Sequence, residues 1–230
     1  MPFAHRLRIV AAAMSLAVGS DTAAEPRPYR LDPVHTRVMF AIDHAGFSKA
    51  IGTVSGSSGS LLFDPDDWTS ATLQASVPIT NIDLGDAGWN KATLAGNLLD
   101  AERYPVAEFV STRVETVASD RASVHGMLTL HGVSRAIVLD VKLNAAKRHP
   151  LPPFRRTVGF SATALLSRKD FGIDAWPSVI GDAVELRIEA EAIRSQMKGE
   201  PDTTDPLDDA SSSADAVPDG AAAMTTEPKP

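Results

Sequence analysis

The 230-residue chain contains no cysteine. This absence excludes disulfide bonds, thiolate nucleophiles and cysteine-ligated metal sites. Whatever fold the chain adopts must therefore be stabilised by its core alone.

Long hydrophobic runs are also missing. The apolar run at residues 9–18 is too short to span a bilayer as a helix. It follows two arginines, Arg6 and Arg8, and precedes the small residues 22–24, an order typical of a secretory signal. We therefore expect residues 1–24 to be a signal peptide, the protein to be exported to the periplasm, and no stable membrane insertion after cleavage.

Clustered positive charge is scarce. The formal net charge is −7, and residues 195–230 hold eight acidic residues against two lysines, so the rest of the chain is nearly neutral. Bases come together in pairs, as at 147–148 and 155–156, and no longer basic cluster occurs, which argues against a nucleic-acid partner. Residues 195–230 also lack aromatic residues and have few large apolar ones, so we expect a disordered acidic tail rich in Pro and Ser.

Alternating apolar and polar residues recur between the two ends. In residues 184–192 every second side chain is apolar and the intervening ones are charged, which predicts a strand with one buried face. The same pattern and its turn residues predict one domain, residues 25–194, with eight strands. The predicted strands are 36–44, 51–63, 71–79, 107–117, 122–130, 134–143, 157–166 and 184–193. Eight antiparallel strands can close into a barrel that encloses one small ligand or fills with side chains.

Two segments depart from simple alternation. Gly52, Gly56 and Gly59 interrupt the second predicted strand and indicate a bulge or a sharp bend. Between Asn81 and Tyr104 the apolar residues recur at three- to five-residue spacing, which predicts one or two short helices at one end of the barrel.

The predicted inward face is strongly apolar. A ligand cavity and a filled core would need the same alternation, so this face alone does not separate the two. The inward set comprises Val38, Phe40, Ile42, Leu73, Val77, Phe109, Val124, Leu128, Leu130, Ile137, Leu139, Val141, Phe160, Leu186 and Ile188.

An ordered set of motifs resembles a known family. The motifs are Tyr29-x-Leu-Asp-Pro-x-His35, Val38-x-Phe-x-Ile-x-His44-x-Gly46, Asn97-Leu-Leu-Asp-x-x-x-Tyr-Pro105, Gly126-x-Leu-Thr-Leu-His-Gly-Val133 and Arg168-x-Asp-Phe-Gly-Ile173. Their order is similar to that of the YceI-like family of exported lipocalin-like proteins. The resemblance implies an all-β fold: an eight-stranded antiparallel lipocalin-like β-barrel with short helices near its opening.

The resemblance also implies a ligand, a long isoprenoid or quinone-like lipid held along the barrel axis. Burial of each CH₂ group contributes about 0.8 kcal/mol, so an apolar tunnel can hold such a tail without polar contacts. Near the opening, Lys91 could meet a phosphate and Asn90 a quinone carbonyl. The predicted ligand-binding residues are Phe40, Ile42, Leu73, Val77, Trp89, Asn90, Lys91, Leu94, Leu98, Phe109, Leu128, Leu139 and Phe160. A homodimer is compatible with this kind of barrel.

The search for catalytic chemistry gives no positive candidate. The histidines at 35, 44, 125 and 131 have no metal-binding spacing, although alternation places His125 and His131 on one face. His44, near a glycine turn, is expected to be a hydrogen-bonded structural residue. Arg168 and Asp170 are expected to lock a loop rather than to catalyse. We therefore expect no catalytic residue, no metal and no cofactor.

Three functional hypotheses remain. The leading one is a periplasmic carrier of an isoprenoid or quinone-like lipid. The second is an enzyme that acts on a lipophilic substrate in the barrel and needs a titrating residue there, such as His44. The third is a packed barrel that serves as a stress-related interaction module. A hollow interior would argue against the third hypothesis.

Overall fold

Strands dominate the structure, a computed structural model that describes residues 25–195. The predicted signal peptide and most of the predicted tail lie outside the described residues. The elements are β1 (Arg27–Leu31), β2 (Arg37–His44), β3 (Ser48–Ser55), β4 (Ser58–Phe63), η1 (Trp68–Ser70), β5 (Thr72–Pro78), η2 (Ile79–Asn81), β6 (Ile82–Asp83), α1 (Ala87–Leu94), β7 (Val106–Ala118), β8 (Arg121–Leu130), β9 (Val133–Arg148), β10 (Arg156–Ser167), η3 (Arg168–Phe171) and β11 (Ile180–Arg194).

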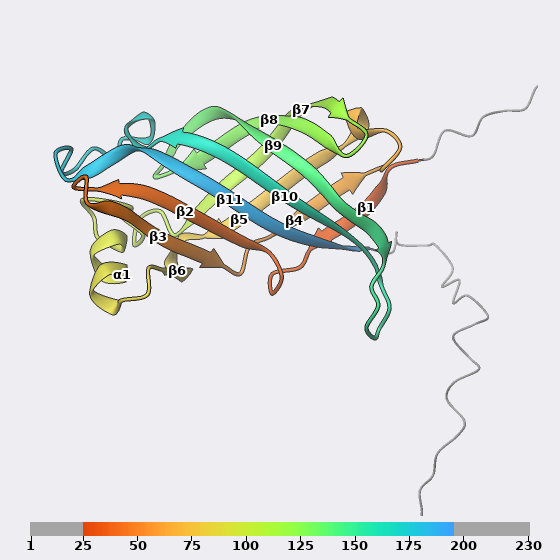
Figure 1. Ribbon diagram of the computed structural model, residues 1–230, viewed down its shortest axis with the longest axis horizontal. Helices are drawn as coiled ribbons and strands as arrows, with labels where there is room; N and C mark the ends of the chain where they lie inside the picture. The colour runs from red at the N-terminus through yellow and green to blue at the C-terminus, as the bar shows by residue number, and fades with distance from the viewer. Residues whose placement is uncertain (1–24, 196–230) are drawn as a thin grey trace, which may run out of the picture. The chain divides into compact units, whose positions relative to one another are not determined.

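The strands close into an antiparallel barrel (Figure 1). The ladder runs β1-β4-β5-β7-β8-β9-β10-β11, and β11 pairs back with β1. β1 pairs with the C-terminal end of β11, and β2 pairs with the preceding part of the same strand. β3 in turn pairs with β2. β1–β2 and β3–β4 thus act as two bent strands, and the barrel has the eight strands that the sequence predicts.

The bend between β3 and β4 lies where the glycines predict it. Gly56 has φ +81°, a left-handed conformation that glycine adopts without strain. Gly59 faces the backbone of β5, where an added Cβ would lie 2.2 Å from the Gln74 carbonyl oxygen. The single predicted strand 51–63 is therefore two strands, and the sequence analysis missed β1 and the two-residue β6.

The helical content matches the lower of the two expected counts: α1 is the one α-helix within residues 25–195. It begins after Asp86, whose side chain accepts a hydrogen bond from the Trp89 backbone N–H at 2.9 Å. No helix in this part of the chain is long and apolar enough to cross a membrane.

The two ends of the barrel carry different connections. We call the end with α1, the β2–β3 turn, the β8–β9 turn and the β10–β11 loop the mouth. We call the other end, with η1 and the β9–β10 hairpin, the closed end. The mouth lies at the left and the closed end at the right of Figure 1.

Candidate functional site

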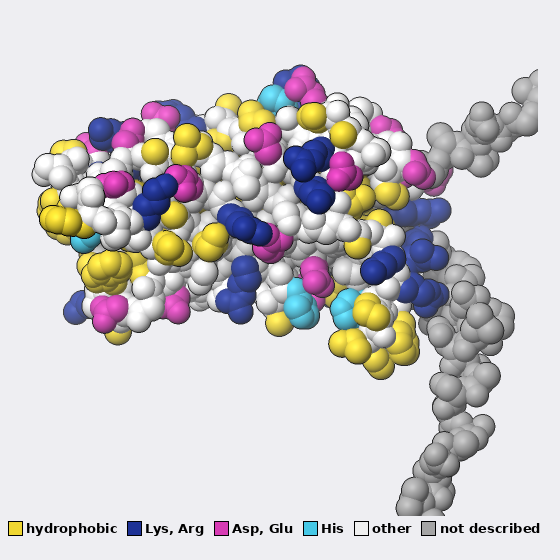
Figure 2. Space-filling model, in the orientation of Figure 1, with side chains coloured by type: hydrophobic (Ala, Val, Ile, Leu, Met, Phe, Trp, Pro, Cys, Tyr) yellow, Lys and Arg dark blue, Asp and Glu magenta, His cyan; other side chains and the backbone are white. Residues whose placement is uncertain are grey.

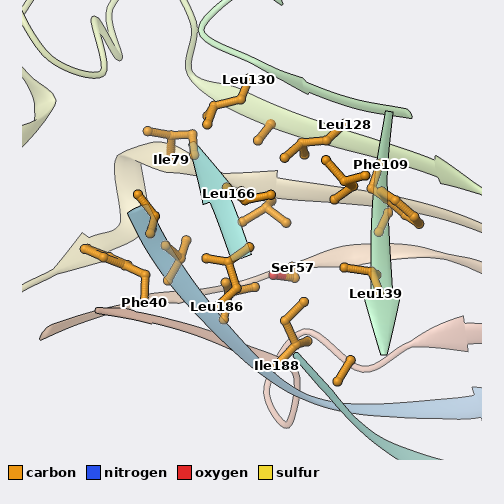
Figure 3. Close-up of a pocket in the computed structure, with 18 of the residues that line it drawn as sticks. Phe40, Ser57, Ile79, Phe109, Leu128, Leu130, Leu139, Leu166, Leu186 and Ile188 are labelled. Atoms are coloured by element: carbon orange, nitrogen blue, oxygen red, sulfur yellow. The ribbon is translucent and has the colours of Figure 1, made fainter. Parts of the chain in front are cut away.

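The barrel interior is hollow. It encloses a cavity of about 580 Å³, within the range of small-molecule sites. All the barrel strands contribute lining residues, and Figure 3 shows their apolar side chains converging from several directions. A packed interior, which the third hypothesis requires, is not what the structure shows.

The predicted inward face is confirmed. All fifteen predicted inward residues, from Val38 to Ile188, line the cavity. Two of the rings among them lie over glycines. A Cβ on Gly52 would lie 2.3 Å from the Phe40 ring, and one on Gly126 would lie 2.3 Å from the Phe109 ring. These glycines therefore make room for rings on the cavity wall.

Ten of the thirteen predicted ligand-binding residues line the cavity, and three do not. The lining residues are Phe40, Ile42, Leu73, Val77, Trp89, Leu98, Phe109, Leu128, Leu139 and Phe160. Asn90, Lys91 and Leu94 lie on α1 away from the lining. Only one face of this helix meets the cavity, because side chains of consecutive helical residues point in different directions.

The three other α1 residues have different surroundings. The Asn90 side chain accepts from the Leu84 backbone N–H at 2.7 Å and donates to the Asp83 carboxylate at 3.2 Å, so it joins α1 to the preceding segment. Leu94 packs against a small apolar cluster that includes Ile79. Lys91 is exposed. Contact of any of them with a ligand stays a prediction.

Three aromatic rings close one end of the cavity. Phe63 is 1% exposed, and its ring meets those of Trp68 and Phe160 edge to face, with centroids 5.2 Å away in both pairs. Trp68 and Phe160 also contact each other at 6.1 Å. The sequence analysis placed Trp68 outside the strands and missed it, because a turn residue has no alternation that reports its direction.

Exposed aromatic residues surround the mouth. Among the cavity-lining residues, the large apolar side chains that are also exposed are Trp89, Trp176 and Val179, on α1 and the β10–β11 loop. The His44 ring contacts the Trp89 ring with centroids 5.5 Å apart. The cavity surface thus continues onto the protein surface at this end. Sequence periodicity missed Trp176 and Val179 because they lie in a loop.

Arg168 holds the β10–β11 loop at the mouth. Its side chain is buried, and its guanidinium donates to three backbone carbonyls: Nε to Gly181 at 2.8 Å, Nη1 to Ile173 at 2.8 Å and Nη2 to Ile180 at 2.9 Å. The predicted loop-locking role is confirmed for Arg168, whereas Asp170 is exposed.

Asp182 provides a second polar contact in the same region. The Lys169 backbone N–H donates to its carboxylate at 3.1 Å and the Ser167 hydroxyl at 2.9 Å. These hydrogen bonds, that of Lys169 first, hold the pKa of Asp182 below its ordinary value, because they stabilise the charged form.

Two polar atoms at the cavity wall are unpaired. The Ser57 hydroxyl and the Trp68 indole N–H are buried and have no hydrogen-bond partner among the described residues. Ser57 lies between β3 and β4, and both residues line the cavity. An unpaired buried polar group costs about 1 to 3 kcal/mol, so either atom is a candidate partner for an oxygen of a bound molecule.

The histidines are dispersed. His35, which is exposed, contacts Asp32, and His125, which is half-buried, contacts Glu115; both histidines lie outside the cavity lining. His131 lies in the turn after β8 with φ +52°, so the prediction that alternation places it on one face with His125 is wrong. His131 Nδ1 lies 3.1 Å from the Phe171 carbonyl oxygen. His44 lines the mouth through a ring contact instead of the structural hydrogen bond that we expected.

The chain resembles several known proteins. Two relatives named UPF0312 protein match over most of their length: one from Serratia proteamaculans is 32% identical over 192 residues, covering 83% of this chain and 97% of the relative. The other, from Pseudomonas savastanoi, is 30% identical over 190 residues, covering 82% and 97%.

Solved structures share the fold at lower identity. BcnA of Burkholderia cenocepacia is 21% identical with a TM-score of 0.63, covering 70% of this chain and 98% of BcnA. A polyisoprenoid binding domain from Saccharophagus degradans, implicated in plant cell wall breakdown, is 16% identical with a TM-score of 0.57, covering 73% and 98%. The model of the YceI-like domain matches residues 29–192. The closed eight-stranded barrel, the two close relatives and this match together show that the chain belongs to the YceI-like family.

Proposed function

We propose that this protein is a periplasmic carrier that holds a long isoprenoid or quinone-like lipid in the barrel interior. The observation that carries the proposal is the hollow, almost wholly apolar cavity that opens at one end and is closed at the other. The printed name of the Saccharophagus degradans domain, which speaks of polyisoprenoid binding, supports the same class of ligand.

The cavity suits a ligand with a long apolar part. Each buried CH₂ group of such a ligand contributes about 0.8 kcal/mol, so the tail can be retained by the apolar wall alone. The polar head would lie at the mouth, beside Trp89 and Trp176, because the aromatic cluster of Phe63, Trp68 and Phe160 blocks the other end. Indole rings are favoured where an apolar region meets water.

Mass spectrometry of an organic extract tests the proposal. The mature protein would be purified without detergent from the periplasm of its own host, beside a mock purification. A stoichiometric isoprenoid or quinone that is absent from the mock would support carriage and identify the ligand. A clean extract, also after candidate lipids are offered to the protein, would overturn it.

A cavity-filling variant makes the test specific to the interior. Ala162 is buried on β10 and lines the cavity, so Ala162→Phe would place a ring where the lipid tail lies. We expect this variant to lose the lipid. Leu165→Phe is the matched control, because Leu165 lies on the same strand but is 68% exposed and outside the lining.

A further inference from the structure

The β9–β10 hairpin has an exposed apolar tip. It projects from the closed end of the barrel, at the lower right of Figure 1. The side chains of Leu151 and Phe154 at its tip are 64% and 46% exposed. Figure 2 shows a hydrophobic cluster there, with Lys and Arg side chains beside it. The tip contributes no residue to the cavity lining, so the proposed carrier function does not account for it.

Four basic side chains stand directly behind the tip. Lys147, Arg148, Arg155 and Arg156 are all exposed, and residues 144–157 contain no Asp or Glu. The register pairs Arg156 with Arg148 and Thr157 with Lys147, so the bases gather where the hairpin begins. Outside residues 195–230 the chain is nearly neutral, so the hairpin is a local concentration of positive charge.

The conformation of Phe154 also calls for an explanation. Its backbone has φ +54°, in the left-handed region that costs a bulky residue about 1 to 2 kcal/mol. Its N–H donates to the Leu151 carbonyl at 2.9 Å and closes the turn. Glycine or asparagine would suit this position without that cost. The Phe154 ring is exposed in spite of this cost, which indicates that it contacts another molecule and does not serve the packing of this chain.

We propose that the β9–β10 hairpin docks on the surface of a bilayer that contains anionic lipids. Leu151 and Phe154 would enter the boundary between head groups and acyl chains, and Lys147, Arg155 and Arg156 behind them would meet the phosphates. The charge of the hairpin complements an anionic surface. The exposed Leu and Phe favour a bilayer over a duplex nucleic acid, because contacts to a phosphate backbone use charged and polar groups and do not need exposed apolar side chains.

The proposal is independent of the cargo. The hairpin lies at the closed end, so its docking leaves the mouth unobstructed. Substitutions in the hairpin do not touch the cavity lining, and the interior should keep its contents in all of them. Loss of docking and loss of lipid carriage are therefore separate results.

Vesicle flotation tests the docking, with the exported protein purified from the periplasm so that the predicted signal peptide is absent. The vesicles contain phosphatidylglycerol and phosphatidylcholine in equal amounts, with pure phosphatidylcholine vesicles for comparison. Each base near an anionic surface strengthens binding about fivefold, so Lys147→Gln, Arg155→Gln and Arg156→Gln together should weaken it about a hundredfold. Leu151→Ser with Phe154→Ser should weaken it about tenfold or more, through loss of apolar burial.

Matched controls distinguish docking through the hairpin from an effect of net charge and from nonspecific hydrophobic adsorption. Arg121→Gln, Arg135→Gln and Lys142→Gln remove three exposed bases elsewhere, and Val117→Ser with Leu165→Ser removes two exposed apolar side chains. We expect both controls to float like the parent protein, and binding of the parent to fall with added salt.

Three results would overturn the proposal. The first is that the parent protein does not float with the anionic vesicles at low salt. The second is that it floats equally well with pure phosphatidylcholine. The third is that duplex DNA binds with the same dependence on the three bases while Leu151→Ser and Phe154→Ser change nothing, which would mark a general polyanion surface.

Discussion

The two ends of the barrel are held in different ways. At the closed end, the rings of Phe63, Trp68 and Phe160 pack against one another inside the sheet. At the mouth, the guanidinium of Arg168 and the carboxylate of Asp182 hold the loop through hydrogen bonds to backbone groups and a hydroxyl.

The difference explains why one end is blocked and the other open. Aromatic rings stabilise a fold by filling interior space, so the rings that stabilise this end of the barrel also block the cavity there. Hydrogen bonds to the backbone fix a loop from within and leave the space beside it empty. Arg168 itself lines the cavity, yet its donors point at carbonyls of its own loop.

The largest expected effect comes from the closed end. Phe63→Ala should lower the free energy of unfolding by about 3 to 5 kcal/mol, because it removes a fully buried ring and leaves a void. Phe47→Ala at the mouth is the matched control, since that ring is 92% exposed and should cost less than about 0.5 kcal/mol. Urea unfolding measures both. Equal costs would contradict the packing role of the aromatic cluster.

At the mouth, Arg168→Met should lower the free energy of unfolding by about 3 kcal/mol. The methionine keeps much of the side-chain volume, but three carbonyls lose their donor, and each unpaired buried group costs about 1 kcal/mol or more. The adjacent Lys169→Met serves as control because Lys169 is exposed. If Arg168→Met and Lys169→Met unfold at the same urea concentration, the hydrogen bonds of Arg168 do not stabilise the mouth.

Asp182→Asn should have a smaller effect that depends on pH. The pKa of this carboxyl is lowered in the folded protein, so its contribution is present above the ordinary value of 3.8 and is lost as the pH falls through the folded pKa. We expect a cost of about 1 kcal/mol at neutral pH that disappears in acid. Thermal unfolding at a series of pH values measures it, with the exposed Asp170→Asn as control. A cost that is constant with pH would exclude the charge as its cause.

The smallest effect is expected at the bend between β3 and β4. Ser57→Ala removes a buried hydroxyl with no partner among the described residues, so stability should stay unchanged or rise by less than about 1 kcal/mol. Thr36→Val is the contrasting variant, because the Thr36 hydroxyl donates to the Glu191 carbonyl. Loss of bound lipid from Ser57→Ala at unchanged stability would show that this hydroxyl contacts the ligand. Destabilisation by Ser57→Ala would contradict our reading of the site.

The sequence was sufficient for the strands and for their inward residues. Side chains alternate across a strand with a period of two, so Val38, Phe40 and Ile42 had to share a face with one another, whatever else surrounded them. Gly56 and Gly59 predicted the bend between β3 and β4 for an equally local reason, since only glycine accepts such close approach and such backbone angles.

What the sequence alone determined is therefore which face of each predicted strand is apolar and that the barrel has eight strands, counting β1–β2 and β3–β4 as one bent strand each. Only the tertiary structure decided that the interior is hollow, that Trp68 joins Phe63 and Phe160 at one end, and that Asn90 and Lys91 lie away from the cavity. Alternation is a property of neighbouring residues, whereas a cavity and its closure depend on how side chains from distant strands and loops share one volume.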